Sequence, residues 1–286
     1  MLDPRSRLAI VIVNYFKADR ILENVEALTR QTIAPRLRVV VVDNSADEAE
    51  RAPLRNGLPA TVQLIILPRN VGYSRGVNLA ALNARPFEDI LLLNPDIVLD
   101  DPEALETLLG EFQAQRDIGV MAALQSNDDG TPVEVARRFP NLVKQVIRRL
   151  KPGAYTDHDV LRPLLERPRS ALLDVDWVQS SFTLVRGDIW EQIGGLDERY
   201  EIFMSDVALC QSVHELGYRV VVSSAVTVRA DGLRASRGGL SAVFHSRALR
   251  VHVRDAVKYQ MRNFFRIPRR GPVAIKRPAD SEPIWH

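Results

Sequence analysis

The stretch LLLNPDIVLD, residues 91–100, joins an apolar run to the polar turn Asn94-Pro95-Asp96. Its leucines end an apolar run that suits a buried strand, and Pro95 stops that strand because proline has no N–H to donate to a sheet. Pro95 also stiffens the turn, so that Asp96 projects from a fixed backbone at the sheet edge. Carboxylate and amide oxygens such as those of Asp96 and Asn94 are ligands that Mg²⁺ or Mn²⁺ prefers. A simple helix-entry turn is the alternative interpretation.

Three earlier apolar runs share the character of residues 89–93. They span residues 8–13, 38–42 and 62–67, and none of them alternates polar with apolar positions. Strands that are covered on both faces have this pattern. Helical patterns lie between some of the runs, and at residues 100–113 Asp and Pro open an amphipathic segment. The alternation predicts an α/β fold with a mostly parallel central sheet flanked by helices.

Polar residues follow three of these runs directly. Asn14-Tyr15 ends the first, Asp43-Asn44 the second and Asn94-Pro95-Asp96 the fourth. Because ligands of parallel sheets collect beyond the carboxyl ends of the strands, these groups are expected to converge on one ligand. The alternative for Asp43 and Asn44 is that they only cap a helix or form a turn.

Composition excludes several classes of protein. A net charge of +2 over 286 residues gives no bulk attraction to nucleic acid, and a single cysteine permits no intramolecular disulfide, which favours a cytoplasmic location. We expect no signal peptide in the short, β-branched N-terminal run, and no bilayer span, since no apolar window reaches about 18 residues. Neither a strand followed by GxGxxG nor a GxxxxGK[ST] loop is present, which argues against a dinucleotide oxidoreductase and a P-loop NTPase.

Six segments, taken together, resemble a known family. In chain order they are VIVNYF, VVDNSAD, RNVGYSRGVNLA, LLLNPDIVL, DWVQSSFTLVRGDIWEQIGGLDERY and FMSDVALCQSVHELGY. They resemble the inverting family 2 glycosyltransferases, and within them the rhamnosyltransferase-like branch, over about residues 7–235. The resemblance implies a GT-A fold over residues 1–235, with a nucleotide-binding half at 1–116 and an acceptor-binding half at 117–235.

The resemblance also implies roles for individual residues. Asp96 would be the ligand of Mg²⁺ or Mn²⁺, and Asp43 would accept a hydrogen bond from the nucleotide base. Trp177, Ser180 and Ser181 would line the sugar and acceptor pocket, where the family usually has Gly-Ala in place of the two serines. The further residues implied to bind the nucleotide-sugar donor are Asn14, Tyr15, Asn70, Gly72, Asn78 and Asn94.

The catalytic base is the position at which the resemblance weakens. The family usually shows Glu-Asp-x-Asp where this chain has Ser205-Asp206-Val207-Ala208, and Asp206 matches the base. The loss of neighbouring carboxylates predicts a lowered pKa for Asp206 if it is otherwise unburied. Asp206 also stands where a helix N-cap is expected, which is the alternative interpretation. Arg229 replaces a histidine that can touch the metal, so it is implied to contact the diphosphate instead.

The C-terminal region is basic. Residues 236–268 are expected to contain an amphipathic helix, and residues 269–286, rich in proline and charge, are expected to be disordered. Such a helix suits an anionic membrane surface, although a helix packed on the domain with a solvated basic face is the alternative. Its basic stripe is Arg247, Arg250, Arg254, Lys258 and Arg262, and its other side is Leu249, Val253, Ala256, Val257 and Phe264.

These observations predict a metal-dependent inverting hexosyltransferase. It would move a sugar, with rhamnose as a candidate, from a nucleotide-diphospho-sugar to a hydroxyl of a surface or cell-wall polysaccharide. The acceptor molecule would be a glycan or a lipid-linked glycan. It would act in the cytoplasm, peripherally at the inner membrane face. Because Ser205, Ala208 and Arg229 depart from the family pattern, a non-catalytic nucleotide-sugar-binding or scaffolding relative stays open as the alternative.

Overall fold

The computed structural model describes residues 7–139, 160–165, 171–201, 204–230, 254–255, 257–259, 261 and 275–276. Strands and helices alternate through its first part, as the sequence predicts. Up to residue 114 the elements are β1 (Leu8–Asn14), α1 (Ala18–Thr29), η1 (Ala34–Arg36), β2 (Leu37–Asp43), α2 (Glu48–Gly57), β3 (Gln63–Ile66), α3 (Tyr73–Ala84), β4 (Asp89–Leu93), β5 (Ile97–Val98) and α4 (Ala104–Ala114).

The second part of the chain follows α4. Its elements are β6 (Ile118–Asn127), β7 (Ala136–Arg137), α6 (Arg162–Leu165), β8 (Leu172–Asp174), β9 (Trp177–Val178), β10 (Phe182–Arg186), α7 (Gly187–Ile193), α8 (Ser205–Glu215), β11 (Arg219–Ala230) and β12 (Ile275–Lys276).

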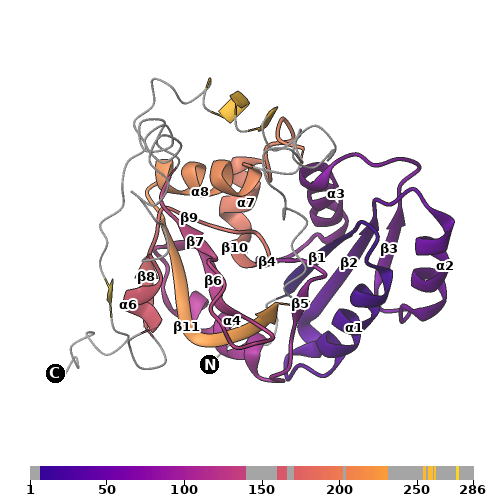
Figure 1. The fold of residues 1–286 in the computed structure, drawn as a ribbon, viewed down its shortest axis with the longest axis horizontal. Coiled ribbons are helices and arrows are strands. Elements are labelled where there is room, and N and C mark those ends of the chain that lie inside the picture. Colours follow the sequence, from indigo (N-terminus) through magenta and orange to yellow (C-terminus); the bar gives the residue numbers. More distant parts are fainter. Residues whose placement is uncertain are drawn as a thin grey trace.

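One curled sheet runs through both parts, in the order β12-β8-β11-β6-β10-β4-β1-β2-β3 (Figure 1). The strands β4, β1, β2 and β3 are parallel, with Asn14 opposite Asp43 and Val11 opposite Leu92. This register confirms the four predicted strands. It brings the carboxyl ends of β1, β2 and β4 to one edge of the sheet.

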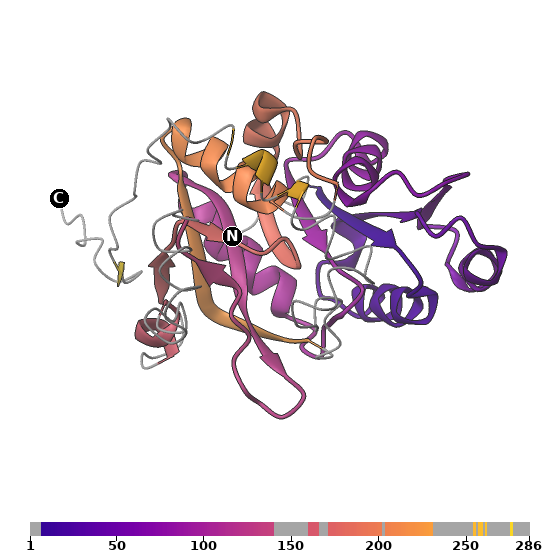
Figure 2. The ribbon, with the colours of Figure 1, turned by 45° about the horizontal axis from the view of Figure 1, so that its top comes forward.

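Strand β10 joins the two halves. It runs antiparallel to β4 on one side and to β6 on the other, so that Leu184 lies opposite both Leu91 and Met121. Beyond it, β6 pairs in parallel with the long β11, which curves across the molecule (Figure 2). The sheet is therefore mostly parallel, and the predicted α/β fold class is confirmed.

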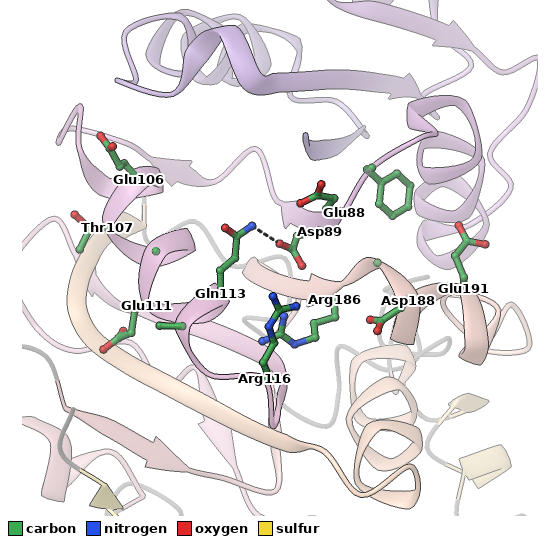
Figure 3. A pocket seen from close by; sticks show the side chains of 14 residues that line it. Glu88, Asp89, Glu106, Thr107, Glu111, Gln113, Arg116, Arg186, Asp188 and Glu191 are labelled. Carbon is green, nitrogen blue, oxygen red and sulfur yellow. Dashed lines mark hydrogen bonds between the residues drawn. The ribbon is translucent and has the colours of Figure 1, made fainter. Parts of the chain in front are cut away.

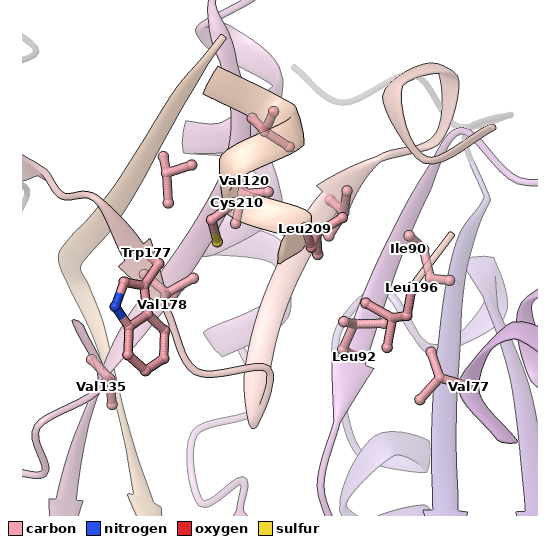
Figure 4. Close-up of a cluster of buried hydrophobic side chains, with 14 of the residues drawn as sticks. Val77, Ile90, Leu92, Val120, Val135, Trp177, Val178, Leu196, Leu209 and Cys210 are labelled. Atoms are coloured by element: carbon pink, nitrogen blue, oxygen red, sulfur yellow. The ribbon is translucent and has the colours of Figure 1, made fainter. Parts of the chain in front are cut away.

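Helices cover both faces of the sheet. Side chains of α3, α7 and α8 pack against one face, where Val77, Leu92 and Leu209 belong to one buried cluster (Figure 4). Side chains of α1 and α4, among them Ile21 and Phe112, pack against the other face. The first cluster continues from β1 to β11 without a break, so the two halves share one core.

The C-terminal region is described at only a few positions. Residues 254–255, 257–259 and 261 are helical, with Asp255 and Tyr259 buried but Val257 and Met261 exposed. Asp255 and Tyr259 dock this helical part, because their polar groups find buried partners. The other residues of 236–268 lie outside the described part.

Two residues of the C-terminal tail join the sheet. Ile275–Lys276 pair with β8 as strand β12, which departs from the disorder expected for residues 269–286 at these two positions. The remaining residues of that tail are outside the described part.

Among the helices that the structure describes, none has the length and apolar character needed to cross a bilayer.

Candidate active site

The three polar strand ends meet at one edge of the sheet. The side-chain amide of Asn14 donates to the Asp43 carboxylate at 3.0 Å. The backbone N–H of Lys17 donates to Asn14 Oδ1 at 2.9 Å, and its ammonium lies 3.3 Å from Asp96 Oδ1. The predicted convergence of Asp43, Asn14 and Asp96 is therefore present.

Asp43 faces inward in this structure. Its side chain is fully buried, and it accepts hydrogen bonds from Asn14, from the Ser45 hydroxyl at 2.6 Å and from Arg51 Nε at 3.1 Å. Arg51 also donates to the Leu67 carbonyl at 2.7 Å, which ties β3 to the same network. A hydrogen bond from a nucleotide base to Asp43 stays a prediction.

The loop 70–72 is shaped by Asn44, at the end of β2. The Asn44 amide donates to Asn70 Oδ1 and to the Gly72 carbonyl, and its oxygen accepts from the Val71 N–H at 2.8 Å. Gly72 has φ +90°, and a Cβ there would lie 2.9 Å from the Glu201 carbonyl oxygen. Glycine is required at this position because both the conformation and the space exclude a side chain.

Two aromatic side chains stand exposed beyond β1. Tyr15 and Phe16 are each about half exposed and contact one another edge to face, with ring centroids 4.8 Å apart. Exposed rings beside a polar edge offer a surface on which a planar base can stack. This placement agrees with the predicted position of Tyr15 beside the nucleotide.

Tyr73 connects this edge with the second half of the chain. Its buried hydroxyl lies 3.2 Å from Asn94 Oδ1 and 3.0 Å from the Ser180 carbonyl oxygen. The Asn94 N–H donates to the Ser181 carbonyl at 2.8 Å, and burial raises the pKa of the Tyr73 phenol. Sequence reasoning assigned Tyr73 no role, although it lies within the motif RNVGYSRGVNLA, because nothing in the sequence shows its distant partners.

Asp206 lies beside the same junction. It is the second residue of α8, and its carboxylate accepts from the Val207 N–H at 2.9 Å and from the backbone of Ser180. Burial raises its pKa to about 6, against the lowering effect of these hydrogen bonds and of Arg137. The predicted lowering of the pKa applied to an otherwise unburied side chain, and burial removes that condition. Capping alone does not explain Asp206, which lies inside the helix.

Trp177 and Arg137 form the wall next to Asp206. Strands β7 and β9 pair Arg137 with Trp177, and the guanidinium lies 5.8 Å from the centre of the Trp177 ring. Arg137 also pairs with Glu134 at 3.2 Å, and Trp177 Nε1 donates to the Arg138 carbonyl at 3.0 Å. The predicted pocket residues Trp177 and Ser180 thus lie on the side of Asp206. Ser181 accepts a hydrogen bond from Gln125 at 2.7 Å.

A cavity of about 1140 Å³ lies elsewhere, at the opposite edge of the sheet (Figure 3). It is lined by the first residue of β4, Asp89, and by the last residue of β10, Arg186. Gln113 donates to Asp89, and Arg186 donates to the carbonyls of Phe112 and Ile118. Because none of the strand-end groups reaches this edge, we place the candidate site at the other one.

The match to a family model decides which family this fold and site represent. The model described as "Glycosyl transferase family 2" matches residues 9–166, more than half of the chain. The chain belongs to glycosyl transferase family 2. The predicted family is confirmed.

Relatives of this family 2 glycosyltransferase include rhamnosyltransferases. N-acetylglucosaminyl-diphospho-decaprenol L-rhamnosyltransferase of Mycobacterium tuberculosis is 25% identical over 232 residues, covering 74% of this chain and 71% of that protein. The O-antigen chain rhamnosyltransferase RfbN of Salmonella typhimurium is 22% identical, with 77% of this chain and 65% of that protein covered.

Solved structures show the same fold at low identity. A mannosyltransferase of Pyrobaculum calidifontis, in complex with GDP-Man and Mn²⁺, matches 90% of this chain and 66% of its own with a TM-score of 0.57 and 15% identity. Staphylococcus aureus TarS 1–349 with UDP matches 79% of this chain and 60% of its own, with a TM-score of 0.53 and 16% identity. These likenesses confirm the GT-A fold.

Two predicted donor residues of the transferase have protein partners. The Asn78 amide donates to the Leu196 carbonyl and accepts from the Leu196 N–H, both at 2.8 Å, which fastens α3 to the turn after α7. Arg229 pairs with Asp100 at 3.1 Å and with Asp128 at 2.8 Å, and these hydrogen bonds raise its pKa. Contacts of Asn78 and Arg229 with a diphosphate stay predictions.

Asp96 offers a half-exposed carboxylate where a metal ion is expected. The turn that holds it is fixed by Asn24, whose amide donates to the Pro95 carbonyl at 3.1 Å. Within the described part of the chain, no group of three or more His, Cys, Asp or Glu side chains could hold a metal. Mg²⁺ is commonly held by one or two carboxylates together with substrate phosphates and water, and Asp96 fits that mode. The Lys17 ammonium supplies a positive charge at this carboxylate.

We predict that Asp206→Asn stabilises the protein at pH 8. The raised pKa means that the ionised carboxylate opposes folding above about pH 6, while its cost disappears below its unfolded pKa near 3.8. The gain at pH 8 is expected to be about 1–2 kcal/mol, allowing for the partial exposure of the side chain, and it should vanish as the pH falls from 6 towards 4. Urea unfolding of the variant and the wild type at pH 8 and at pH 4 measures this difference in the free energy of unfolding. Asp129→Asn is the control, because the Asp129 pKa is lowered; an equal gain in both variants would contradict the assignment.

Proposed function

We propose that this chain is an inverting glycosyltransferase that moves a sugar from a nucleotide-diphospho-sugar to a glycan hydroxyl, with dTDP-L-rhamnose as the leading donor candidate. The observation that carries the proposal is the position of Asp206 beside the backbone of Ser180, whose carbonyl accepts from the Tyr73 hydroxyl, which in turn lies beside Asn94. The candidate base and the strand ends proposed to bind the donor therefore both border the place where Tyr73 and Ser180 join the two halves.

The proposed reaction needs one proton acceptor. The acceptor hydroxyl attacks the anomeric carbon from the face opposite the nucleotide, the new C–O bond forms, and the bond to the diphosphate breaks. Asp206 takes the hydroxyl proton, and the nucleoside diphosphate leaves with the electron pair. The transition state resembles the oxocarbenium ion of glycoside hydrolysis. A carboxylate with a pKa of about 6 is ionised at neutral pH and still basic enough for this transfer.

The leaving diphosphate needs compensation of its charge. Asp96 would hold Mg²⁺ or Mn²⁺, which supplies that charge when bound. Lys17 lies 3.3 Å from Asp96 and would add a cationic donor at the same place. Tyr15 and Phe16 would flank the nucleoside, and the loop fixed by Asn44 would border the pyrophosphate.

The choice of rhamnose and of a surface or cell-wall polysaccharide rests on the relatives. Their names include a rhamnosyltransferase for a diphospho-decaprenol-linked acceptor and two O-antigen chain rhamnosyltransferases. A lipid-linked acceptor would be met at the cytoplasmic membrane face. At the described C-terminal positions, basic Arg254 and Lys258 are exposed together with apolar Val257 and Met261, a combination that suits an anionic bilayer surface.

We expect the wild type to transfer sugar from one member of a nucleotide-sugar panel to a lipid-linked glycan. Asp206→Asn should lower kcat by about 10²- to 10⁴-fold with donor binding retained, because only the proton acceptor is lost. The kcat/KM of the wild type should fall below about pH 6, as Asp206 is protonated. Asp129→Asn is the matched control. Donor binding by calorimetry without transfer to any acceptor would favour the non-catalytic, scaffolding alternative.

We expect turnover to depend on the metal through Asp96. EDTA should abolish transfer, and Mn²⁺ or Mg²⁺ should restore it in the wild type. Asp96→Ala should lose about 10²-fold or more in kcat/KM, since uncompensated charge on the leaving group raises the barrier. Titration of Mn²⁺ in the presence of nucleoside diphosphate reads the metal site independently of turnover. Equal activity of Asp96→Ala and wild type would refute the metal role.

We expect binding to anionic but not to neutral lipid vesicles. Negative charge introduced at the exposed apolar pair, by Val257→Asp with Met261→Asp, should reduce co-sedimentation with phosphatidylglycerol vesicles several-fold, because apolar insertion and charge attraction are both weakened. Leu82→Asp is the control, since Leu82 is exposed on α3 instead. Binding that both variants retain equally would place the contact elsewhere.

A further inference from the structure

Asp255 is a buried carboxylate that the proposed chemistry does not use. It is fully buried and accepts a hydrogen bond from the Glu201 backbone N–H at 3.0 Å. Arg254 lies 2.6 Å from the Glu201 carboxylate and 3.4 Å from that of Asp255. A buried carboxylate that receives a backbone N–H fixes the peptide it binds, because losing that bond leaves a buried charge without its partner.

Tyr259, one helical turn further on, makes a second attachment. Its hydroxyl donates to Gln211 Oε1 on α8 at 2.8 Å, and its ring lies 6.3 Å from that of Tyr200. The ring is almost fully buried. Asp255 and Tyr259 therefore attach the segment 254–261 both to α8 and to residues 200–201.

Residues 200–201 in turn hold the beginning of α3. The Tyr73 N–H donates to the Glu201 carbonyl at 2.7 Å, and the Ser74 hydroxyl donates to the Tyr200 carbonyl at 2.6 Å. Gly72 packs so closely on Glu201 that a Cβ would lie 2.9 Å from its carbonyl oxygen. The loop 70–72 is therefore fixed by two sets of contacts. Asn44 at the end of β2 makes one set, and residues 200–201 make the other.

The same residues enclose a polar cavity of about 360 Å³. Asn70, Val71 and Arg75 line it from the donor side, and Arg254 and Lys258 line it from the C-terminal segment. The segment thus contributes two cationic side chains next to a predicted donor residue, Asn70. The C-terminal residues and the donor loop therefore border one cavity, in addition to the link through residues 200–201.

We infer that Asp255 and Tyr259 form a positioning element of the donor site. Asp255 fixes residues 200–201, and these fix Gly72, Tyr73 and Ser74. This inference rests on the proposed function for its kinetic consequence. Because Tyr73 reaches Asn94, the effect extends from the C-terminal segment to the Asn94-Pro95-Asp96 turn. Asp255 is not a catalytic residue, since it acts through the backbone of Glu201.

The test compares Asp255→Ala, Asp255→Asn and the exposed control Asp129→Ala. Among the described residues, Asp129 accepts hydrogen bonds from Thr131 within its own turn. Asp255→Ala should raise the donor KM about 5- to 10-fold with the acceptor KM unchanged, because a displaced loop weakens donor binding. Asp255→Asn keeps an oxygen that accepts from Glu201 and should recover most of the loss. A merely destabilised enzyme would lose active molecules and thus kcat, leaving KM in place.

A second readout is independent of transfer. Amide hydrogen exchange of Tyr73 and Glu201 in the ligand-free protein should accelerate about tenfold or more in Asp255→Ala, while the amides of Val11 and Leu92 in the sheet keep their rates. If the wild type transfers no sugar, the proposed function fails and the exchange result alone decides the inference. Should Asp255→Ala fail to fold, Tyr259→Phe, which removes only one hydroxyl, takes its place. Unchanged Tyr73 exchange together with an unchanged donor KM would overturn the inference.

Discussion

The buried hydroxyl of Tyr73 is the contact on which the arrangement of the site depends. It lies between Asn94 Oδ1 of the first half and the Ser180 carbonyl oxygen of the second, and its single proton is shared between these two acceptors. A buried phenol without partners is costly, so this contact favours a single relative position of the two halves. The same helix start, through the Tyr73 N–H, receives residues 200–201 and the C-terminal segment behind them.

Around this contact the sheet provides a rigid frame. Three parallel strands end at the same level, and β10 continues the ladder into the second half without a gap. Side chains at the ends of such strands are held by backbone hydrogen bonds on both sides, which suits groups that must be placed accurately. Asp206 is held instead by the first turn of α8 and the backbone of Ser180, in surroundings dry enough to raise its pKa.

The family 2 membership and this geometry account for different parts of the proposal. The family match and the shared fold establish the class of transferase. The Asp206 carboxylate, whose pKa burial raises to about 6, supports a working base despite the reduced Ser205-Asp206-Val207-Ala208 motif. The loss of flanking carboxylates was expected to weaken Asp206 as a base, but burial acts in the opposite direction and strengthens it.

The sequence by itself determined the strands, their parallel order in the first half and the polar residues that end them, because uninterrupted apolar runs and a proline stop are local signals. Through the ordered motifs it also singled out Asp206, Trp177 and Asn94 as site residues, and their roles stay predictions. Only the tertiary structure decided that Tyr73 joins the halves, that Asp43 faces Arg51, and that Asp255 and Tyr259 dock the described C-terminal residues. Each of these depends on a partner far away in the chain, and neither the periodicity nor the spacing of residues records which distant group will satisfy a buried polar atom.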